Sequence, residues 1–154
     1  MSRRCVFLDR DGVINAKIEG DYVRHWSQFE FLPAIADWIR IFNALDFLVI
    51  VVTNQRGIAL GKMTEADVET IHELMKHELS SRGARIDDIY TCPHGEECCD
   101  CRKPKPGMIY KARQKWDIDL SGSLLIGDSD SDADLAAACG LRFLRALNGH
   151  LQKP

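Results

Sequence analysis

Short apolar segments alternate with longer segments of helical periodicity along almost the whole chain. The segments expected to form strands are residues 5–9, 47–54, 88–92, 123–128 and 141–147. Those expected to form helices, with apolar residues at helical spacing, are residues 33–45, 64–83, 106–116 and 132–140. In the helix that begins at Thr64, the apolar face is expected at Val68, Ile71, Leu74, Met75 and Leu79. This alternation predicts an α/β domain with a parallel sheet and helices on both faces.

The composition is typical of one globular domain. Apolar residues make up 45% of the 154 residues and charged residues 28%, which allows a core within a single domain spanning residues 1–154. The net charge of −3 gives no general attraction to nucleic acid or an anionic membrane, so a bound anion must be held by local positive groups. No segment resembles a signal peptide, and no apolar run approaches the roughly 20 residues that span a bilayer. We therefore expect a cytoplasmic protein, and because the sequence shows no surplus amphipathic surface we also expect a monomer.

Polar side chains follow four of the expected strands. They are Asp9 and Asp11, Thr53 and Asn54, Cys92 on the way to Lys103, and Asp128 with Asp132. Right-handed crossovers bring the carboxyl ends of parallel strands to one edge of a sheet, where ligands bind in such folds. These residues are therefore expected to share one site.

Asp9 and Asp11, in the segment FLDRDGVIN, are close enough to share a pocket, and Gly12 allows the backbone to turn sharply after them. Two neighbouring carboxylates are unfavourable unless a cation lies between them or one is protonated. Alone, the motif is also typical of an ordinary turn. With the other strand ends it supplies a nucleophile, an acid, metal ligands, a hydroxyl donor and a fixed cation, which predicts phosphoryl transfer. A catalytically inactive, zinc-stabilised binding module is the alternative of another class.

The segment CPHGEECCDC, residues 92–101, holds four of the six cysteines and one histidine. In a reducing compartment such clusters are more often metal ligands than disulfides, and two C-x-[HC] pairs suit a tetrahedral zinc set. A redox dithiol would more often be C-x-x-C, and scattered reduced cysteines are the remaining alternative. Because Cys98 and Cys99 are adjacent, either could complete the set.

The motifs DxDG, an apolar strand ending in TN, KP before a helix, and GDxxxD resemble those of the haloacid dehalogenase (HAD) superfamily of phosphatases. Their order and spacing match from about residue 5 to residue 146. The resemblance implies a Rossmann-like sheet in which Asp9 is the nucleophile and Asp11 the general acid and base. It also implies that Thr53 and Lys103 hold the transferring phosphoryl group.

The same resemblance implies two metal ions. A catalytic Mg²⁺ would be bound by Asp9, Asp128 and the backbone carbonyl of Asp11, with Asp132 beyond the direct ligands. The segments CPH and CDCRKP are similar to the branch of histidinol phosphatases and heptose-bisphosphate phosphatases, in which a short zinc loop replaces a cap domain. By that match the ligands of a structural Zn²⁺ are Cys92, His94, Cys99 and Cys101, and Cys98 is a bystander.

The substrate expected from this resemblance is a phosphorylated sugar or amino alcohol. The segments GDYVRHWSQFEFLPA and TNQRGIALGK are more similar to heptose-bisphosphate phosphatases, whereas the short zinc loop is closer to the histidinol-phosphate type. The resemblance thus implies hydrolysis of the 7-phosphate of D-glycero-D-manno-heptose 1,7-bisphosphate, with histidinol phosphate as the alternative. A second anion site would use Arg102, Arg56 or Ser129, although Arg56 could equally be a solvated loop charge. The residues expected to contact substrate are Gly20, Asp21, Tyr22, Asn54, Gln55, Arg56, Arg102 and Ser129.

Overall fold

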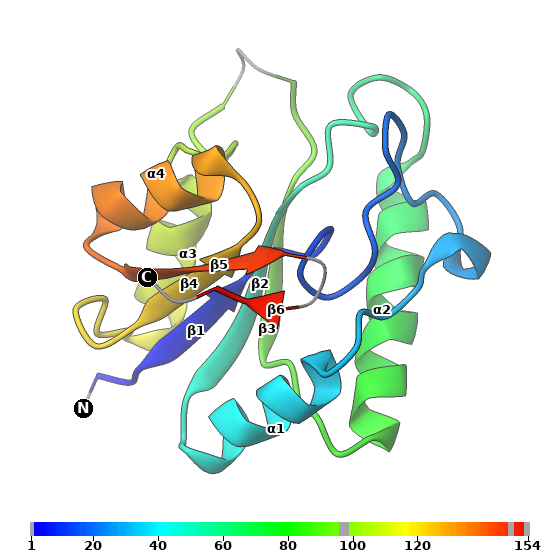
Figure 1. Ribbon diagram of the computed structural model, residues 1–154. Helices are drawn as coiled ribbons and strands as arrows, with labels where there is room; N and C mark the ends of the chain where they lie inside the picture. The colour runs from blue at the N-terminus through cyan, green and yellow to red at the C-terminus, as the bar shows by residue number, and fades with distance from the viewer. Residues whose placement is uncertain (1, 96–98, 148–149, 153–154) are drawn as a thin grey trace.

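The computed structural model describes residues 2–95, 99–147 and 150–152. These residues form a sheet of six strands in the order β3-β2-β1-β4-β5-β6 (Figure 1). The strands are β1 (Cys5–Leu8), β2 (Leu48–Asn54), β3 (Asp88–Cys92), β4 (Leu124–Gly127), β5 (Arg142–Leu147) and β6 (His150–Leu151). Strands β1 to β5 pair in parallel, and β6 pairs antiparallel with β5.

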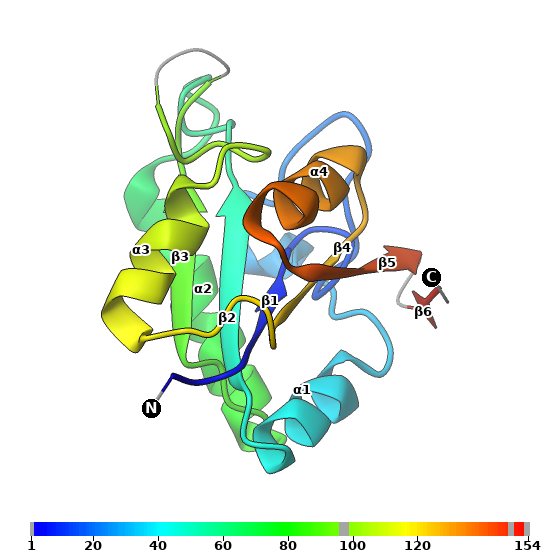
Figure 2. The ribbon, with the colours of Figure 1, turned by 90° about the vertical axis from the view of Figure 1, so that its left-hand side faces the viewer.

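Helices cover both faces of the sheet (Figure 2). They are α1 (Ile35–Ala44), α2 (Glu65–Ser81), α3 (Gly107–Trp116) and α4 (Asp130–Cys139), with a short 3-10 helix η1 (Trp26–Gln28) before α1. Helices α1 and α2 pack on one face, and α3 and α4 pack on the other. The predicted α/β architecture, a parallel sheet between two layers of helices, is confirmed. Among the described residues no helix is long and apolar enough to cross a membrane.

The core lies on both sides of β1. Every side chain of this strand is buried, and alternation sends Cys5 and Phe7 toward α3 and α4 while Val6 and Leu8 face α1 and α2. A strand covered on both faces needs apolar residues at each position, which explains its uninterrupted apolar sequence. The parallel pairing of β1 with β2 and β4 brings the carboxyl ends of these strands to one edge, where the site lies.

Three details differ from the expectation. Helix α1 begins at Ile35 rather than Pro33 because Ala34 has a left-handed φ of 68° and cannot continue a helix. Strand β6 was not expected, since its pairing with β5 depends on tertiary structure. On α2, Leu74 is 39% exposed, whereas His72 is only 6% exposed and takes a place in the buried face.

Candidate functional site

The loop that follows β1 places Asp9 and Asp11 at the carboxyl edge of the sheet. The Asp9 amide donates to the Ile126 carbonyl of β4 at 3.0 Å, which anchors the loop to the neighbouring strand. Gly12 has a φ of 90°, and a Cβ atom there would overlap the Asp128 carboxylate. Two features therefore require glycine at this position: the positive backbone angle φ and the close approach of the loop after β4.

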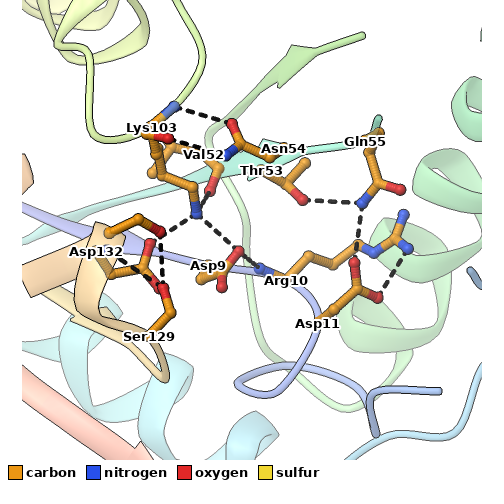
Figure 3. A network of polar contacts seen from close by, with 11 residues as sticks. Asp9, Arg10, Asp11, Val52, Thr53, Asn54, Gln55, Lys103, Ser129 and Asp132 are labelled. Carbon is orange, nitrogen blue, oxygen red and sulfur yellow. Dashed lines mark hydrogen bonds and ion pairs between the residues drawn. The ribbon is translucent and has the colours of Figure 1, made fainter. Parts of the chain in front are cut away.

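A buried lysine connects the loop after β1 with β2 and with the first turn of α4 (Figure 3). Lys103 Nζ donates to Asp9 Oδ1 at 2.9 Å, to Asp132 Oδ1 at 2.7 Å and to the Val52 carbonyl oxygen at 3.1 Å. Burial alone would lower the pKa of Lys103, but the two carboxylates outweigh it and raise that pKa. Burial also raises the pKa of Asp9 well above its ordinary value, against the attraction of Lys103. The lysine therefore stays charged, whereas Asp9 needs further positive charge nearby to ionise as readily as a free carboxyl group.

The carboxyl groups of this cluster outnumber its positively charged groups. Asp9, Asp128 and Asp132 each offer a carboxylate oxygen, and these three atoms lie within 4.8 Å of one another. When all three are ionised, the single ammonium of Lys103 leaves an excess of negative charge in a largely buried place, which oxygen-binding divalent cations compensate. Both oxygens of Asp132 are already engaged, by Lys103 and by the Ser129 hydroxyl. The donor set thus fits Mg²⁺, with Asp9 and Asp128 better placed than Asp132 to be direct ligands.

Asp11 is held by three side-chain donors, two from its own loop and one from the residue after β2. Its Oδ1 accepts from Arg10 Nη2 and from Asn15 Nδ2, each at 2.9 Å, and its Oδ2 accepts from Gln55 Nε2 at 3.0 Å. Burial would raise the pKa of Asp11, but the Arg10 guanidinium and these hydrogen bonds outweigh it and lower that pKa. The carboxylate is therefore oriented and ionised, as a proton acceptor must be. Arg10 and Asn15 were not expected at the site.

Thr53 and Asn54 at the end of β2, and Gln55 directly after it, hold neighbouring site residues in place. Asn54 Oδ1 accepts from the Lys103 amide at 3.0 Å, and Asn54 Nδ2 donates to the Lys103 carbonyl at 3.4 Å, so this side chain fixes the backbone of the lysine. Gln55 Nε2 also donates to Thr53 Oγ1 at 2.9 Å. Gln55 and Thr53 are each about 1% exposed. Gln55, expected to contact substrate, instead lies under the pocket and connects Thr53 with Asp11.

A pocket of about 460 Å³ opens above these groups. Of the predicted residues, it is lined by Asp9, Asp11, Gly20, Asp21, Tyr22, Asn54, Arg56, Arg102, Lys103, Asp128 and Ser129. Lys17 and Lys62 also line it and were not predicted, although Lys62 ends the segment TNQRGIALGK. Ser129 caps α4 by accepting from the Asp132 amide at 3.3 Å, so its hydroxyl has a structural role as well.

The cysteine segment forms a compact cluster of sulfur and nitrogen atoms. His94 Nδ1 lies 3.6 Å from Cys92 Sγ and 3.3 Å from Cys101 Sγ, and Cys92 Sγ lies 3.7 Å from Cys99 Sγ. All four donor atoms are within 4.8 Å of one another, which suits a tetrahedral zinc site. The expectation for Cys98 falls outside the described residues.

The thiols of this cluster differ in acidity. Burial raises the pKa of Cys92 and raises that of Cys101 to about 12, whereas the backbone amides of Arg102 and Cys101 outweigh desolvation at Cys99 and lower its pKa to about 6. A metal ion would bind all three as thiolates, since a bound cation favours the charged form. The Arg102 amide donates to Cys99 Sγ at 3.3 Å, so the cluster contacts the backbone of the residue directly before Lys103.

Comparison with known proteins finds close relatives along most of the chain. A family model described as HAD-hydrolase-like matches residues 100–153. The D-glycero-alpha-D-manno-heptose-1,7-bisphosphate 7-phosphatase of Mycobacterium bovis is 45% identical over 134 residues, which cover 86% of this chain and 70% of the relative. The D-glycero-beta-D-manno-heptose-1,7-bisphosphate 7-phosphatase of Rhodopseudomonas palustris is 43% identical over 151 residues, which cover 93% of this chain and 83% of the relative.

A solved structure has the same fold. The crystal structure of D,D-heptose 1,7-bisphosphate phosphatase from B. bronchiseptica, complexed with magnesium and phosphate, superposes with a TM-score of 0.87 at 35% sequence identity. The superposition covers 95% of this chain and 83% of that chain.

Proposed function

Because this chain belongs to the HAD-like family of heptose-1,7-bisphosphate 7-phosphatases, we propose that it hydrolyses the 7-phosphate of D-glycero-D-manno-heptose 1,7-bisphosphate. One observation carries the proposal beyond the family likeness. Asp9, Lys103 and Asp132 form a buried, ion-paired array at the floor of a pocket. This array has the nucleophile and the fixed positive charge that phosphoryl transfer needs.

The reaction follows from the positions of these groups. A carboxylate oxygen of Asp9 attacks phosphorus, and the bond from phosphorus to the sugar oxygen breaks while Asp11 gives that oxygen a proton. Lys103 and the Thr53 hydroxyl hold the transferring phosphoryl group. Water then attacks the aspartyl-phosphate and gives a proton to Asp11, which releases phosphate and restores the carboxylate of Asp9.

Asp11 must hold a proton for the first step, although its pKa is lowered in the protein alone. A substrate phosphate dianion in the pocket is a like charge close to this carboxylate, and a like charge disfavours ionisation. Binding of substrate thus raises the proton affinity of Asp11 at the stage that requires an acid. Departure of the phosphoryl group from the sugar leaves Asp11 ionised for the second step.

Two metal ions complete the proposal. Mg²⁺, held by Asp9, Asp128 and the backbone carbonyl of Asp11, would neutralise charge on the phosphoryl oxygens. Zn²⁺ at Cys92, His94, Cys99 and Cys101 would be structural, because the protein fills all four positions.

The charge of the outer pocket favours a bisphosphate over histidinol phosphate. Lys17, Arg56, Lys62 and Arg102 line the pocket in addition to Lys103. Asp21 also lines it, but this carboxylate is paired with Arg24 at 2.7 Å. These positively charged side chains attract a second phosphate and repel the ammonium group of histidinol phosphate. Arg102 is one of the predicted candidates, and its Nη1 is buried with no hydrogen-bond partner among the described residues.

The test compares kcat/KM for both anomers of the heptose bisphosphate with that for histidinol phosphate in the presence of Mg²⁺. We expect a bisphosphate anomer to be preferred by at least tenfold. A preference of that size for histidinol phosphate would refute the substrate assignment. Absence of phosphate release from every ester would favour the inactive binding module.

A further inference from the structure

Arg10, the residue between the two motif aspartates, does not enter the pocket. Its side chain is completely buried, with an exposure of 0%, and it turns toward α2. There Nη2 donates to Asp11 Oδ1 at 2.9 Å, and Nη1 lies 3.1 Å from His72 Nε2. The guanidinium also lies 5.8 Å from the centre of the Phe29 ring. One fully buried cation therefore connects α2 to the carboxylate that moves protons.

His72 completes this arrangement from the third turn of α2. The guanidinium has only donors, so His72 Nε2 must accept its hydrogen bond, and the imidazole is neutral with its proton on Nδ1. His72 is 6% exposed and has no part in the reaction described above. A buried arginine whose donors lose their partners is costly, so the position of the guanidinium depends on both His72 and Asp11.

The hydrogen bonds to Asp11 divide its two oxygens. Oδ1 accepts two hydrogen bonds, from Arg10 and Asn15, whereas Oδ2 accepts one, from Gln55. A carboxylate oxygen has two lone-pair directions, so Oδ1 is saturated and Oδ2 keeps one free. The orientation set by Arg10 thus determines which oxygen can exchange a proton with the leaving group.

We infer that His72 and Arg10 are positioning residues for the acid and base step: His72 fixes the Arg10 guanidinium, which fixes Asp11 so that Oδ2 transfers the proton. The inference rests on the proposed function, because it assumes that Asp11 protonates the leaving oxygen. It predicts that a substitution at His72 lowers kcat/KM more strongly for a substrate whose leaving group must be protonated.

The test separates the need for an acid from the integrity of the fold by changing the leaving group. An alkoxide such as that of the heptose needs a proton to leave, whereas the phenolate of 4-nitrophenyl phosphate leaves without one. The value of kcat/KM reports the steps up to leaving-group departure. In His72→Leu, which cannot accept from Arg10, we expect kcat/KM for the heptose bisphosphate to fall at least tenfold. The fall should not exceed the roughly 10²- to 10⁴-fold that proton transfer contributes in total. For 4-nitrophenyl phosphate it should change less than about threefold, since no proton transfer is lost there.

Two further variants serve as controls. His72→Gln keeps an acceptor for Arg10 and should retain most of the activity on both substrates. His77→Gln changes an exposed histidine of the same helix and should match wild type. If His72→Leu does not fold, as judged by its circular dichroism and melting, His72→Asn replaces it, because that shorter side chain cannot reach Arg10.

The outcomes distinguish the inference from the proposed function. Equal losses on both substrates would assign His72 a structural role alone, and unchanged rates would show that the contact is irrelevant; either overturns the inference while leaving the phosphatase intact. A wild-type protein that cleaves 4-nitrophenyl phosphate but no heptose bisphosphate overturns the proposed substrate, and the split is then measured with glycerol phosphate as the alkyl ester. A wild type that cleaves no ester overturns both.

Discussion

Replacing His72 with glutamine should make the fold less sensitive to acid. Burial, and the Arg10 guanidinium after it, lower the pKa of His72 from 6.5 to about 3. Below pH 6.5 the unfolded chain therefore binds a proton that the folded chain cannot, so stability that is fully present above pH 6.5 is lost as the pH falls toward 3. At pH 5 the difference spans one and a half pH units at about 1.4 kcal/mol each, or about 2 kcal/mol from this one imidazole.

Urea unfolding of the zinc-loaded protein at pH 7.5 and pH 5 measures this effect. Wild type should lose about 2 kcal/mol more than His72→Gln between the two pH values. Protonation of the thiolates and loss of zinc weaken both proteins alike, so they cancel in the difference. His77→Gln should lose as much as wild type. If wild type and His72→Gln lose the same free energy, the imidazole titrates normally and the buried, neutral state assigned to it is wrong.

Four further substitutions test the site and the cysteine loop. Lys103→Met should lower kcat by about 10²- to 10³-fold in a phosphate-release assay, because a preorganised cation is removed from the phosphoryl group; a loss below tenfold would contradict that role. Metal analysis should find about one zinc per chain in Cys98→Ser but none in Cys101→Ser, and the reverse would exchange their assignments. Lys62→Ala should raise KM for the heptose bisphosphate roughly fivefold and leave that for 4-nitrophenyl phosphate unchanged, since the aryl ester has no second phosphate; equal KM changes would place Lys62 elsewhere.

The assembly of the site was predictable because each motif side chain lies at or after the end of an apolar segment that predicts a strand. The apolar segments before Asp9, Thr53 and Asp128 give the strands, and parallel connection brings their carboxyl ends together. The spacing of the expected zinc ligands was also informative, because His94 Nδ1 lies close to both Cys92 Sγ and Cys101 Sγ.

The residues that hold the site's side chains in place could not be predicted in the same way. An arginine after an aspartate is ordinarily exposed, and nothing in the sequence indicates that Arg10 is buried under the pocket. His72 interrupts the apolar face of α2, where periodicity alone favoured Leu74. The contact of Asn54 with Lys103 joins residues 49 positions apart and depends on how two loops meet. These are tertiary pairings that local patterns do not encode.

The most direct test of the account is to follow the two phosphates of heptose 1,7-bisphosphate separately by ³¹P NMR. With Mg²⁺ and the wild-type protein, the signal of the 7-phosphate should be replaced by that of inorganic phosphate while the 1-phosphate remains, and Asp9→Asn should leave both signals unchanged. Release of the 1-phosphate, or equal rates for wild type and Asp9→Asn, would contradict the account.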